Sequence, residues 1–358
     1  MTCRPGRRLL ALAILLDVAA CGGIGPKIAR DGQIGYAQAL SDAAKEQVLL
    51  NIVRLRYADV PTFLSVNQVV ASYTVQGTIS LGTDLVDSSG WSLSDDVNIG
   101  VGATITDNPV VTYAPVTGRD LAELLLAPLA ASDLFGLLLA GVPPELALGL
   151  GLSSLNGLRN SQVGPLGTIS GDSQFEEALE LLVRLARQGH LRPRIDGTGA
   201  GRTVVLVLQP QTEARTELDW RRLLELLQIQ PGTSELRVVP GVSRRGGNVL
   251  TVGTRSLIEI MGQLAANVEV PADDLEAGRT FRVPEASFAR GPMPTMTIRN
   301  DRFRPDDALV AARYSDRWFW IDDRDVDSKR VFTFLMLLAS LAESAKPGQA
   351  PIITIPAG

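Results

Sequence analysis

The most regular hydrophobic pattern of the chain is an alternation of apolar and polar or small residues between Val69 and Ile105. Apart from Gly77, apolar residues occupy every second position of 69–81 and of 97–105, and apart from Val70, hydroxyls, amides and glycines lie between them. A period of two is typical of strands with two unlike faces. The pattern therefore predicts a long antiparallel hairpin with one apolar face and one polar face.

Segments whose apolar residues have helical spacing precede and follow this hairpin. Apolar residues recur every three or four positions from Tyr36 to Tyr57, which predicts a helix. The preceding residues 21–35 are small and rich in glycine, and we expect a tether there. Residues 119–160 are mostly helical in pattern and unusually apolar. Pro143-Pro144 interrupts this segment, so we expect short packed helices in place of a membrane span.

The next part of the chain alternates strand and helix patterns. The polar, glycine-rich stretch 162–172 is the best domain boundary, and Ser173 with Glu176 forms a capping-box pattern after it. Strands are expected at 203–208, 236–239 and 249–252, and helices at 174–188, 217–229 and 255–268. Such alternation predicts a small α/β or α+β layer.

The tail has the pattern of a compact α+β unit. After a surface connection at 272–294, we expect strands at 295–299, 309–314 and 317–321, a helix at 327–343 and a closing strand at 352–355. The whole chain is predicted to be α+β: an N-terminal helix with a long hairpin and apolar helices, then mixed α/β layers, then a β-meander plus helix. The expected divisions are 1–20 (leader), 21–35 (tether), 36–161, 173–271 and 295–358.

The first residues have the parts of a secretory leader. Arginines precede an apolar run from Leu9 to Ala20, and small residues lead into Cys21. The run has twelve residues, and a spanning helix needs about 20. Cys21 after small residues resembles the lipobox of bacterial lipoproteins, although Asp17 departs from that pattern. An ordinary signal peptide or a membrane anchor is the alternative.

The lipobox resemblance implies a localisation. It implies that the chain is cut before Cys21, that the thiol carries a diacylglycerol and that the new amine is acylated, for example with palmitate. Several acyl chains would hold the protein firmly on a membrane. Gly22 after the cysteine resembles lipoproteins that are sorted to the outer membrane, so we expect the protein to face the periplasm.

Composition excludes several kinds of site. Cleavage would remove three arginines and Asp17, which changes the formal charge from −5 to −7. A negative chain argues against nucleic acid as a partner. Cys3 would leave with the leader and Cys21 would be lipidated, so no free thiol remains for a disulfide or a zinc site. His190 is the only histidine, and no Gly-x-Ser-x-Gly motif is present. We expect no cofactor and no enzymatic activity.

Three stretches resemble an uncharacterised family of bacterial cell-envelope lipoproteins. They are residues 51–57 (NIVRLRY), 112–118 (TYAPVTG) and 318–325 (WFWIDDRD). With the lipobox they extend over nearly the whole mature chain. The resemblance implies one coherent envelope protein, and it implies no particular activity.

A few residues are candidates for binding. Arg54, Arg56 and Tyr57 could hold an anionic partner or pair with the acidic tail, and Trp318 with Trp320 could form a peptide or glycan platform or pack in the core. The acidic residues between Asp322 and Asp327 could bind calcium, but capping of the following helix is the simpler interpretation.

Two functions are consistent with the sequence. We expect a lipid-anchored, non-enzymatic scaffold or assembly partner that contacts other envelope proteins. The alternative is a subunit of an oligomeric outer-membrane β-barrel pore built from the hairpin at 69–106, because uncharged alternating strands of this length could span a membrane. A homo-oligomer stays open. We favour a soluble sheet whose apolar face is covered by the helices of residues 119–160.

Overall fold

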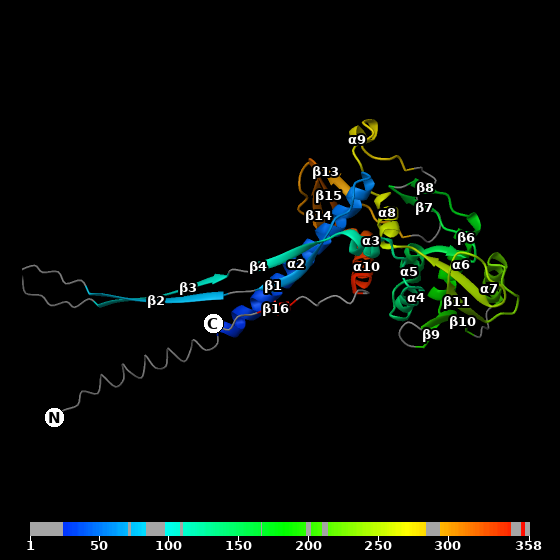
Figure 1. Cartoon of the computed structure of the whole chain (residues 1–358), viewed down its shortest axis with the longest axis horizontal. Coiled ribbons are helices and arrows are strands. Elements are labelled where there is room, and N and C mark those ends of the chain that lie inside the picture. The colour runs from blue at the N-terminus through cyan, green and yellow to red at the C-terminus, as the bar shows by residue number, and fades with distance from the viewer. Residues whose placement is uncertain are drawn as a thin grey trace, which may run out of the picture. The chain divides into compact units, whose positions relative to one another are not determined.

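The computed structural model of the chain describes residues 24–70, 73–83, 97–107, 110–165, 167–197, 202–209, 214–283, 294–344 and 352–354. Helices and strands both contribute substantially, which confirms the predicted α+β class. The chain forms two compact units (Figure 1). Unit 1 comprises Met1–Pro61 and Leu124–Ala342, and unit 2 comprises Thr62–Glu123 and Glu343–Gly358. The predicted leader and Cys21 lie outside the described residues.

The described helices are short except for the first and the last. Their bounds are α2 Ile24–Arg56, α3 Gly118–Leu126, α4 Ala131–Leu139, α5 Pro144–Gly151, α6 Ser173–Arg187, α7 Ala214–Leu226, α8 Leu257–Ala265, α9 Ala272–Glu276 and α10 Val326–Ser344. As predicted, the two prolines separate two short helices, because Pro143 is the N-cap of α5 and Pro144 its first residue. None of the helices described is long and apolar enough to cross a bilayer.

Helix α2 is longer than the sequence predicts. It begins at Ile24, so residues 24–35, predicted as part of a flexible tether, belong to the helix. Its only proline, Pro26, lies in the first turn, where a missing N–H leaves no helical hydrogen bond unmade. Near its other end, α2 buries Val48, Leu49, Ile52, Val53 and Leu55.

Unit 1 contains a six-stranded mixed sheet in the order β6-β5-β12-β11-β10-β9. The strands are β5 Leu152–Leu155, β6 Leu158–Arg159, β9 Leu191–Asp196, β10 Thr203–Leu208, β11 Glu235–Pro240 and β12 Val249–Thr254. Helix α4 packs across β9 to β12, and α6 contacts β9 and β6. Successive residues are buried along β10 and β12, so both faces of the sheet are covered there.

This sheet corrects the prediction for residues 152–159, which form two strands and not a helix. Asn156 and Gly157 have φ values of 49° and 94°, so they make a tight turn that a regular helix cannot contain. Because β5 and β6 join the same sheet as β9 to β12, the sheet extends across the domain boundary expected at 162–172. That stretch contains the small hairpin of β7 Gln162–Gly164 and β8 Gly167–Ile169.

The predicted capping box at the start of α6 is wrong. Asp172 occupies the N-cap position, Ser173 is already helical, and no side chain caps this end. The Asp172 carboxylate instead accepts a hydrogen bond from the Arg159 N–H at 2.7 Å. A true capping box lies at α8, where Ser256 and Glu259 bond reciprocally.

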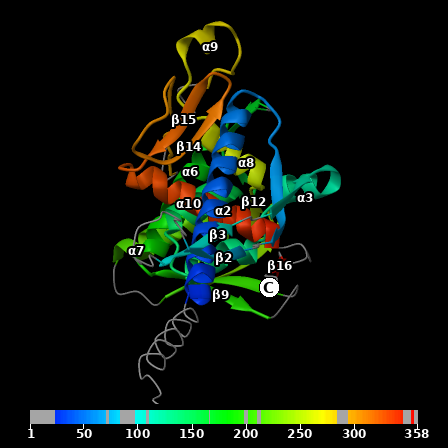
Figure 2. The same cartoon turned by 90° about the vertical axis from the view of Figure 1, so that its left-hand side faces the viewer.

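A second sheet of unit 1 has three strands, β13 Arg299–Asp301, β14 Ala308–Tyr314 and β15 Arg317–Asp322. Their order is β13-β15-β14, so the predicted meander is wrong: the last strand lies in the middle. The turn between β14 and β15 contains Ser315 at φ 54°. Helix α2 packs against β14, β15 and α8 (Figures 1 and 2).

Unit 2 consists mainly of strands: β1 Phe63–Val70, β2 Tyr73–Thr83, β3 Val97–Asp107, β4 Val110–Val116 and β16 Ile352–Thr354. The predicted hairpin is confirmed, because β2 and β3 are antiparallel from Tyr73↔Asp107 to Thr83↔Val97. The register aligns apolar positions with apolar positions, for example Ile79 with Val101 and Leu81 with Ile99. The joining loop at 84–96 lies outside the described residues.

The rest of unit 2 differs from the prediction in two ways. The first hairpin strand, expected from Val69, begins at Tyr73 as β2, whereas Val69 and Val70 end a separate strand, β1, which begins at Phe63 and pairs antiparallel with β4. Strand β16, expected to close the C-terminal unit, pairs parallel with β1. Helices α4 and α5, which were expected to cover the hairpin, belong to unit 1.

Candidate functional site

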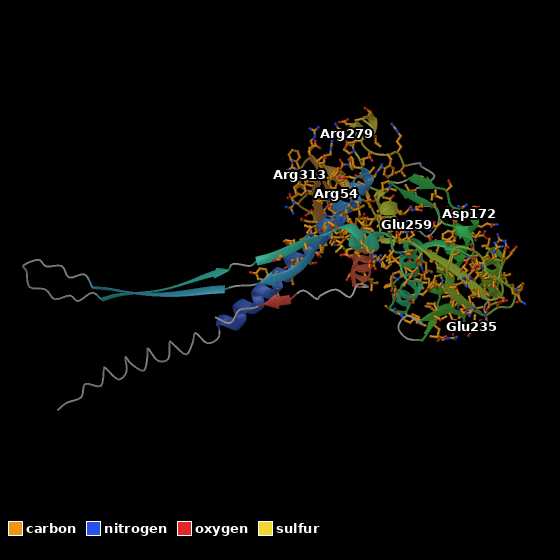
Figure 3. All side chains as sticks on the ribbon, viewed as in Figure 1. Arg54, Asp172, Glu235, Glu259, Arg279 and Arg313 are labelled. Carbon is orange, nitrogen blue, oxygen red and sulfur yellow. The ribbon has the colours of Figure 1, made fainter. Side chains whose placement is uncertain are left out.

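The predicted binding residues lie around the three-stranded sheet of unit 1. Arg54, Arg56 and Tyr57 come from the C-terminal end of α2, and Trp318 and Trp320 come from β15. Arg54, Arg279 and Arg313 are seen in this part of the unit in Figure 3. The chain leaves α2 through Ala58 at φ 57°, and the Asp59 N–H bonds back to the Arg54 carbonyl at 2.8 Å.

Arg56 is a structural residue. Its side chain is 4% exposed, and its Nη1 donates a hydrogen bond to the Phe281 carbonyl at 2.5 Å. The guanidinium carbon lies 4.6 Å from the centre of the Phe281 ring, and the Thr280 hydroxyl donates to the Arg56 carbonyl at 2.6 Å. Burial lowers the pKa of Arg56. These contacts fix the 280–281 segment to α2 and leave Arg56 inaccessible to a partner.

Tyr57 joins three elements. Its hydroxyl donates to Asp274 Oδ2 at 2.7 Å, and its ring lies 5.0 Å from that of Tyr314 and edge-on to Phe319 at 6.1 Å. Burial, followed by the hydrogen bond to the Asp274 carboxylate, raises the pKa of Tyr57 far above its ordinary value. With Arg279 these residues line a cavity of about 290 Å³. The cavity is small, and the hydroxyl that it contains is already paired.

Arg54 is half-buried and close to its own helix. Its Nη1 donates to the side-chain oxygen of Asn51, one turn earlier, at 3.3 Å. Asn51 is fully buried. The pKa of Tyr314 is raised, mainly by burial and then by the negative charge of Asp59, whereas the positive charge of Arg54 lowers it.

The two tryptophans lie on the less covered face of the sheet. Phe319 and Ile321 are buried on the opposite face, whereas Trp318 and Trp320 are half-buried. The guanidinium carbon of Arg304 lies 5.2 Å from the centre of the Trp318 ring. The predicted alternation is therefore confirmed, and the core lies on the Phe319 side.

The acidic segment before α10 caps this helix and forms ion pairs. Asp325 Oδ1 accepts a hydrogen bond from the Ser328 N–H at 3.0 Å and Oδ2 accepts one from its hydroxyl at 2.6 Å, which confirms the predicted helix cap. These hydrogen bonds lower the pKa of Asp325. Asp322, Asp323 and Asp327 form ion pairs with Arg299, Lys329 and Arg330. Within the part of the chain that the structure describes, no group of acidic, histidine or cysteine residues has the arrangement of a metal site.

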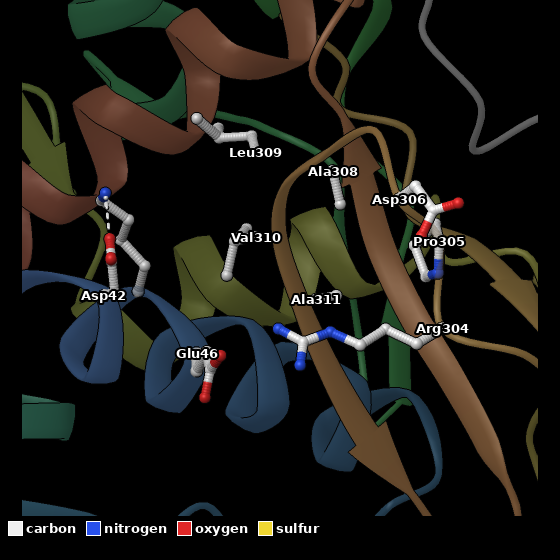
Figure 4. A pocket seen from close by; sticks show the side chains of 10 residues that line it. Asp42, Glu46, Arg304, Pro305, Asp306, Ala308, Leu309, Val310 and Ala311 are labelled. Carbon is white, nitrogen blue, oxygen red and sulfur yellow. Dashed lines mark hydrogen bonds and ion pairs between the residues drawn. The ribbon is translucent and has the colours of Figure 1, made fainter. Parts of the chain in front are cut away.

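The larger cavity lies between α2 and the start of β14. Its volume is about 510 Å³, and we call it the α2–β14 groove. Figure 4 shows its lining: α2 contributes one side, the 304–306 loop another, and four consecutive strand residues the third. The lining residues are Asp42, Lys45, Glu46, Arg304, Pro305, Asp306, Ala308, Leu309, Val310 and Ala311.

The groove contains more negative than positive side chains. Lys45 Nζ lies 2.8 Å from the Asp42 carboxylate, so these two neutralise each other. Glu46 and Asp306 form no ion pair within 4 Å with any described residue, and the single remaining cation, Arg304, stacks on Trp318. Figure 4 shows the Arg304 side chain extending across the groove towards the α2 side, where Glu46 lies. The five charged groups sum to −1, from three carboxylates and two cations.

No sequence pattern indicates the groove. Its two sides are far apart in the sequence and neither has a motif. The available signal was indirect: Leu309 to Ala312 is an uncharged strand segment that lacks the charges found at other strand edges.

Comparison with known proteins does not assign this chain to a family. No protein-family description, curated protein or solved structure matches this chain.

Proposed function

We propose that the protein is a lipid-anchored scaffold of the bacterial cell envelope, attached through Cys21 to the outer membrane and facing the periplasm. One observation supports this most: α2 begins three residues after Cys21 and ends as a buried element of unit 1. A helix of 33 residues is about 50 Å long at 1.5 Å per residue. Lipid on Cys21 would thus be joined to the folded unit by a semi-rigid connection.

The exposure of α2 along its length fits this role. From Ile34 to Glu46 most side chains are exposed, and from Val48 to Arg56 most are buried. The first part is a spacer and the second is part of the core. A scaffold needs a partner-binding surface at a set distance from its anchor, and the α2–β14 groove lies beside this spacer.

The anchor is tested by replacing each cysteine in turn. Cys21→Ser should lose incorporation of a labelled palmitate and either leave the membrane fraction or accumulate as a precursor. Cys3→Ser is the matched control and should behave as wild type, because Cys3 lies in the leader. Membrane retention of a cleaved Cys21→Ser protein would refute the anchor. Turnover of a substrate that a point mutation in a cavity abolishes would refute the scaffold role.

A pore subunit is the second candidate function, supported by the β2–β3 hairpin. Eleven residue pairs align two alternating strands, and a spanning strand needs about 9–11 residues. The pairing of apolar with apolar positions is the pattern that lipid contact on one face would require.

Ile99→Asp distinguishes the two functions, with Asn98→Asp on the alternate face as its control. In a scaffold with a buried hairpin face, the unpaired carboxylate should destabilise the protein itself, visible as a lower melting temperature in detergent-free buffer. In a pore subunit the unlipidated protein should stay folded while membrane-embedded oligomers fail to form. Asn98→Asp should change neither measurement much.

A further inference from the structure

The cavity of about 290 Å³ beside Tyr57, which we call the Tyr57 cavity, is lined by aromatic and by charged side chains. Its aromatic wall consists of Tyr57, Tyr314 and Phe319, and the ring of Tyr57 lies 5.0 and 6.1 Å from the other two. Ligand sites usually combine such apolar walls with a few placed polar groups, in volumes of about 300–1,000 Å³. The Tyr57 cavity is therefore of the size that takes one small molecule.

The carboxylate of Asp274 belongs to the frame of the cavity. Its Oδ2 accepts the hydrogen bond of the Tyr57 hydroxyl at 2.7 Å, and its Oδ1 lies 3.0 Å from Arg279 Nη1. The Asp274 side chain is only 14% exposed. Because both oxygens are occupied and the charge is neutralised by Arg279, Asp274 holds the aromatic wall in place.

The two other charged residues of the cavity, Asp316 and Arg317, lack oppositely charged partners among the residues that the structure describes. Arg317 is half-buried, and its Nη1 donates to the neutral side chain of Asn300 at 3.3 Å. Asp316 is exposed and forms no ion pair with Arg317, its neighbour in the chain. One carboxylate and one guanidinium beside the aromatic wall are thus available to a ligand.

The turn that carries these two charges has a fixed conformation. Tyr314 and Arg317 are paired where β14 and β15 end and begin, so the turn consists of Ser315 and Asp316 alone. Ser315, which also lines the cavity, has a φ of 54°, a value that is uncommon for residues other than glycine. Such conformations persist where the surrounding structure determines them, and they are concentrated at functional sites.

We propose that the Tyr57 cavity binds a small zwitterion, namely a free amino acid with an apolar side chain. Its carboxylate would pair with Arg317, its ammonium with Asp316, and its side chain would lie against Tyr57 and Tyr314. Arginine binds a carboxylate through two parallel hydrogen bonds, and aromatic rings attract an ammonium group. A simple anion would meet the Asp316 carboxylate, and a simple cation would meet the Arg317 guanidinium. This site goes beyond the scaffold role and does not depend on the anchor.

The probe is racemic phenylalanine, titrated by calorimetry into the full-length protein purified in mild detergent, with detergent alone as the blank. We expect saturable binding. Phenethylamine, which lacks the carboxylate, should bind about tenfold more weakly, and hydrocinnamate, which lacks the ammonium, about threefold more weakly. Glycerophosphoethanolamine carries both charges in the form of a lipid headgroup but has no apolar body, and it should bind more weakly than phenylalanine.

Two pairs of variants test the charged residues. Arg317→Gln should weaken phenylalanine binding about tenfold to hundredfold, and Arg317→Lys should weaken it less. Arg313→Gln, at an exposed arginine of β14 outside the cavity, should change nothing. Asp316→Asn should weaken binding about threefold, whereas Asp273→Asn, at an exposed carboxylate of α9, should not. Because Asp316 is exposed, its variant tests the proposal even if Arg317→Gln fails to fold.

Four results would overturn the inference. One is the absence of saturable phenylalanine binding at millimolar concentration. Another is equal weakening by Arg317→Gln and Arg313→Gln, which would place the binding site elsewhere. A third is hydrocinnamate or phenethylamine binding as tightly as phenylalanine, since the ligand would then need only one charge. The last is tighter binding of glycerophosphoethanolamine, which would make a lipid headgroup the source of the zwitterion.

Discussion

The two larger sheets of unit 1 differ in how completely the protein covers them. The six-stranded sheet has helices against it and buried residues in succession along β10 and β12. Beside it the buried Arg255, 1% exposed, is paired internally, because it donates to the carbonyls of Ser161, Leu150 and Gly149. The three-stranded sheet has one buried face and one face on which Trp318 and Trp320 are only half-buried. The first sheet is thus covered more completely by its own chain than the second.

The largest effect is expected in the core of the six-stranded sheet. Phe175, on α6, is fully buried, and Phe175→Ala should destabilise the protein by about 3–5 kcal/mol. Urea unfolding measures this loss. Phe303→Ala is the control, because Phe303 is 80% exposed and should change stability by less than about 0.5 kcal/mol. Equal losses would show that the two sheets are not covered as differently as their burial indicates.

A smaller but still large loss is expected from the polar interior of the same sheet. The Asn156 side chain donates to the Leu227 carbonyl at 2.8 Å and accepts from the Thr251 N–H and hydroxyl at 2.9 and 3.0 Å. Asn156→Leu should cost about 2–4 kcal/mol, because it leaves buried groups unpaired. The exposed Asn248→Leu should be nearly neutral by the same unfolding measurement. A neutral Asn156→Leu would mean that the turn repacks.

Beside the three-stranded sheet the effects should be smaller. Asp325→Ala removes the cap of α10 and should cost about 0.5–2 kcal/mol at pH 7. Because hydrogen bonding lowers the pKa of Asp325 in the folded state, its contribution is present above its unfolded pKa of about 3.9 and is lost as pH falls further. The difference from wild type should therefore shrink at pH 2. Asp327→Ala, which does not remove the cap, should show little effect at either pH.

The smallest change is expected at Tyr57. Tyr57→Phe removes the hydrogen bond to Asp274 and should cost about 0.5–1.5 kcal/mol at pH 7. Because the folded pKa of Tyr57 is raised, its neutral form stabilises the fold below the unfolded pKa of about 10, and this contribution declines as pH rises above it. Wild type should lose stability more steeply than Tyr57→Phe between pH 9 and 11. Tyr113→Phe, at an exposed tyrosine, should leave the slope unchanged.

Periodicity predicted most of the regular elements but not their partners. The buried stripe of α2, the alternation in β2 and β3 and the apolar side of α10 are local, so spacing alone revealed them. On that side of α10, Phe332 and Leu335 are buried. Which strands pair depends on residues far apart in sequence, and so the positions of β16 and β15 were predicted incorrectly.

The candidate site shows the same limit. Arg56 and Trp318 carry groups that could equally bind a partner or hold the fold together, and their residue types do not decide between these roles. Only the contact of Arg56 with the 280–281 segment shows that it is structural. The groove depends on α2 lying beside β14, and no local pattern encodes that proximity.

The pairing of β16 with β1 has a consequence for the order of folding. Gln68 lies opposite Ile352, so the sheet of unit 2 joins an early part of the chain to nearly its last residues. Such a long loop closes late, and closing it slows folding. During synthesis from the N-terminus, β1 and β4 can pair before β16 has emerged, and the side of β1 that β16 later occupies then remains free. A chain stopped before Ile352 would keep this edge unpaired, where it could join strands of other molecules.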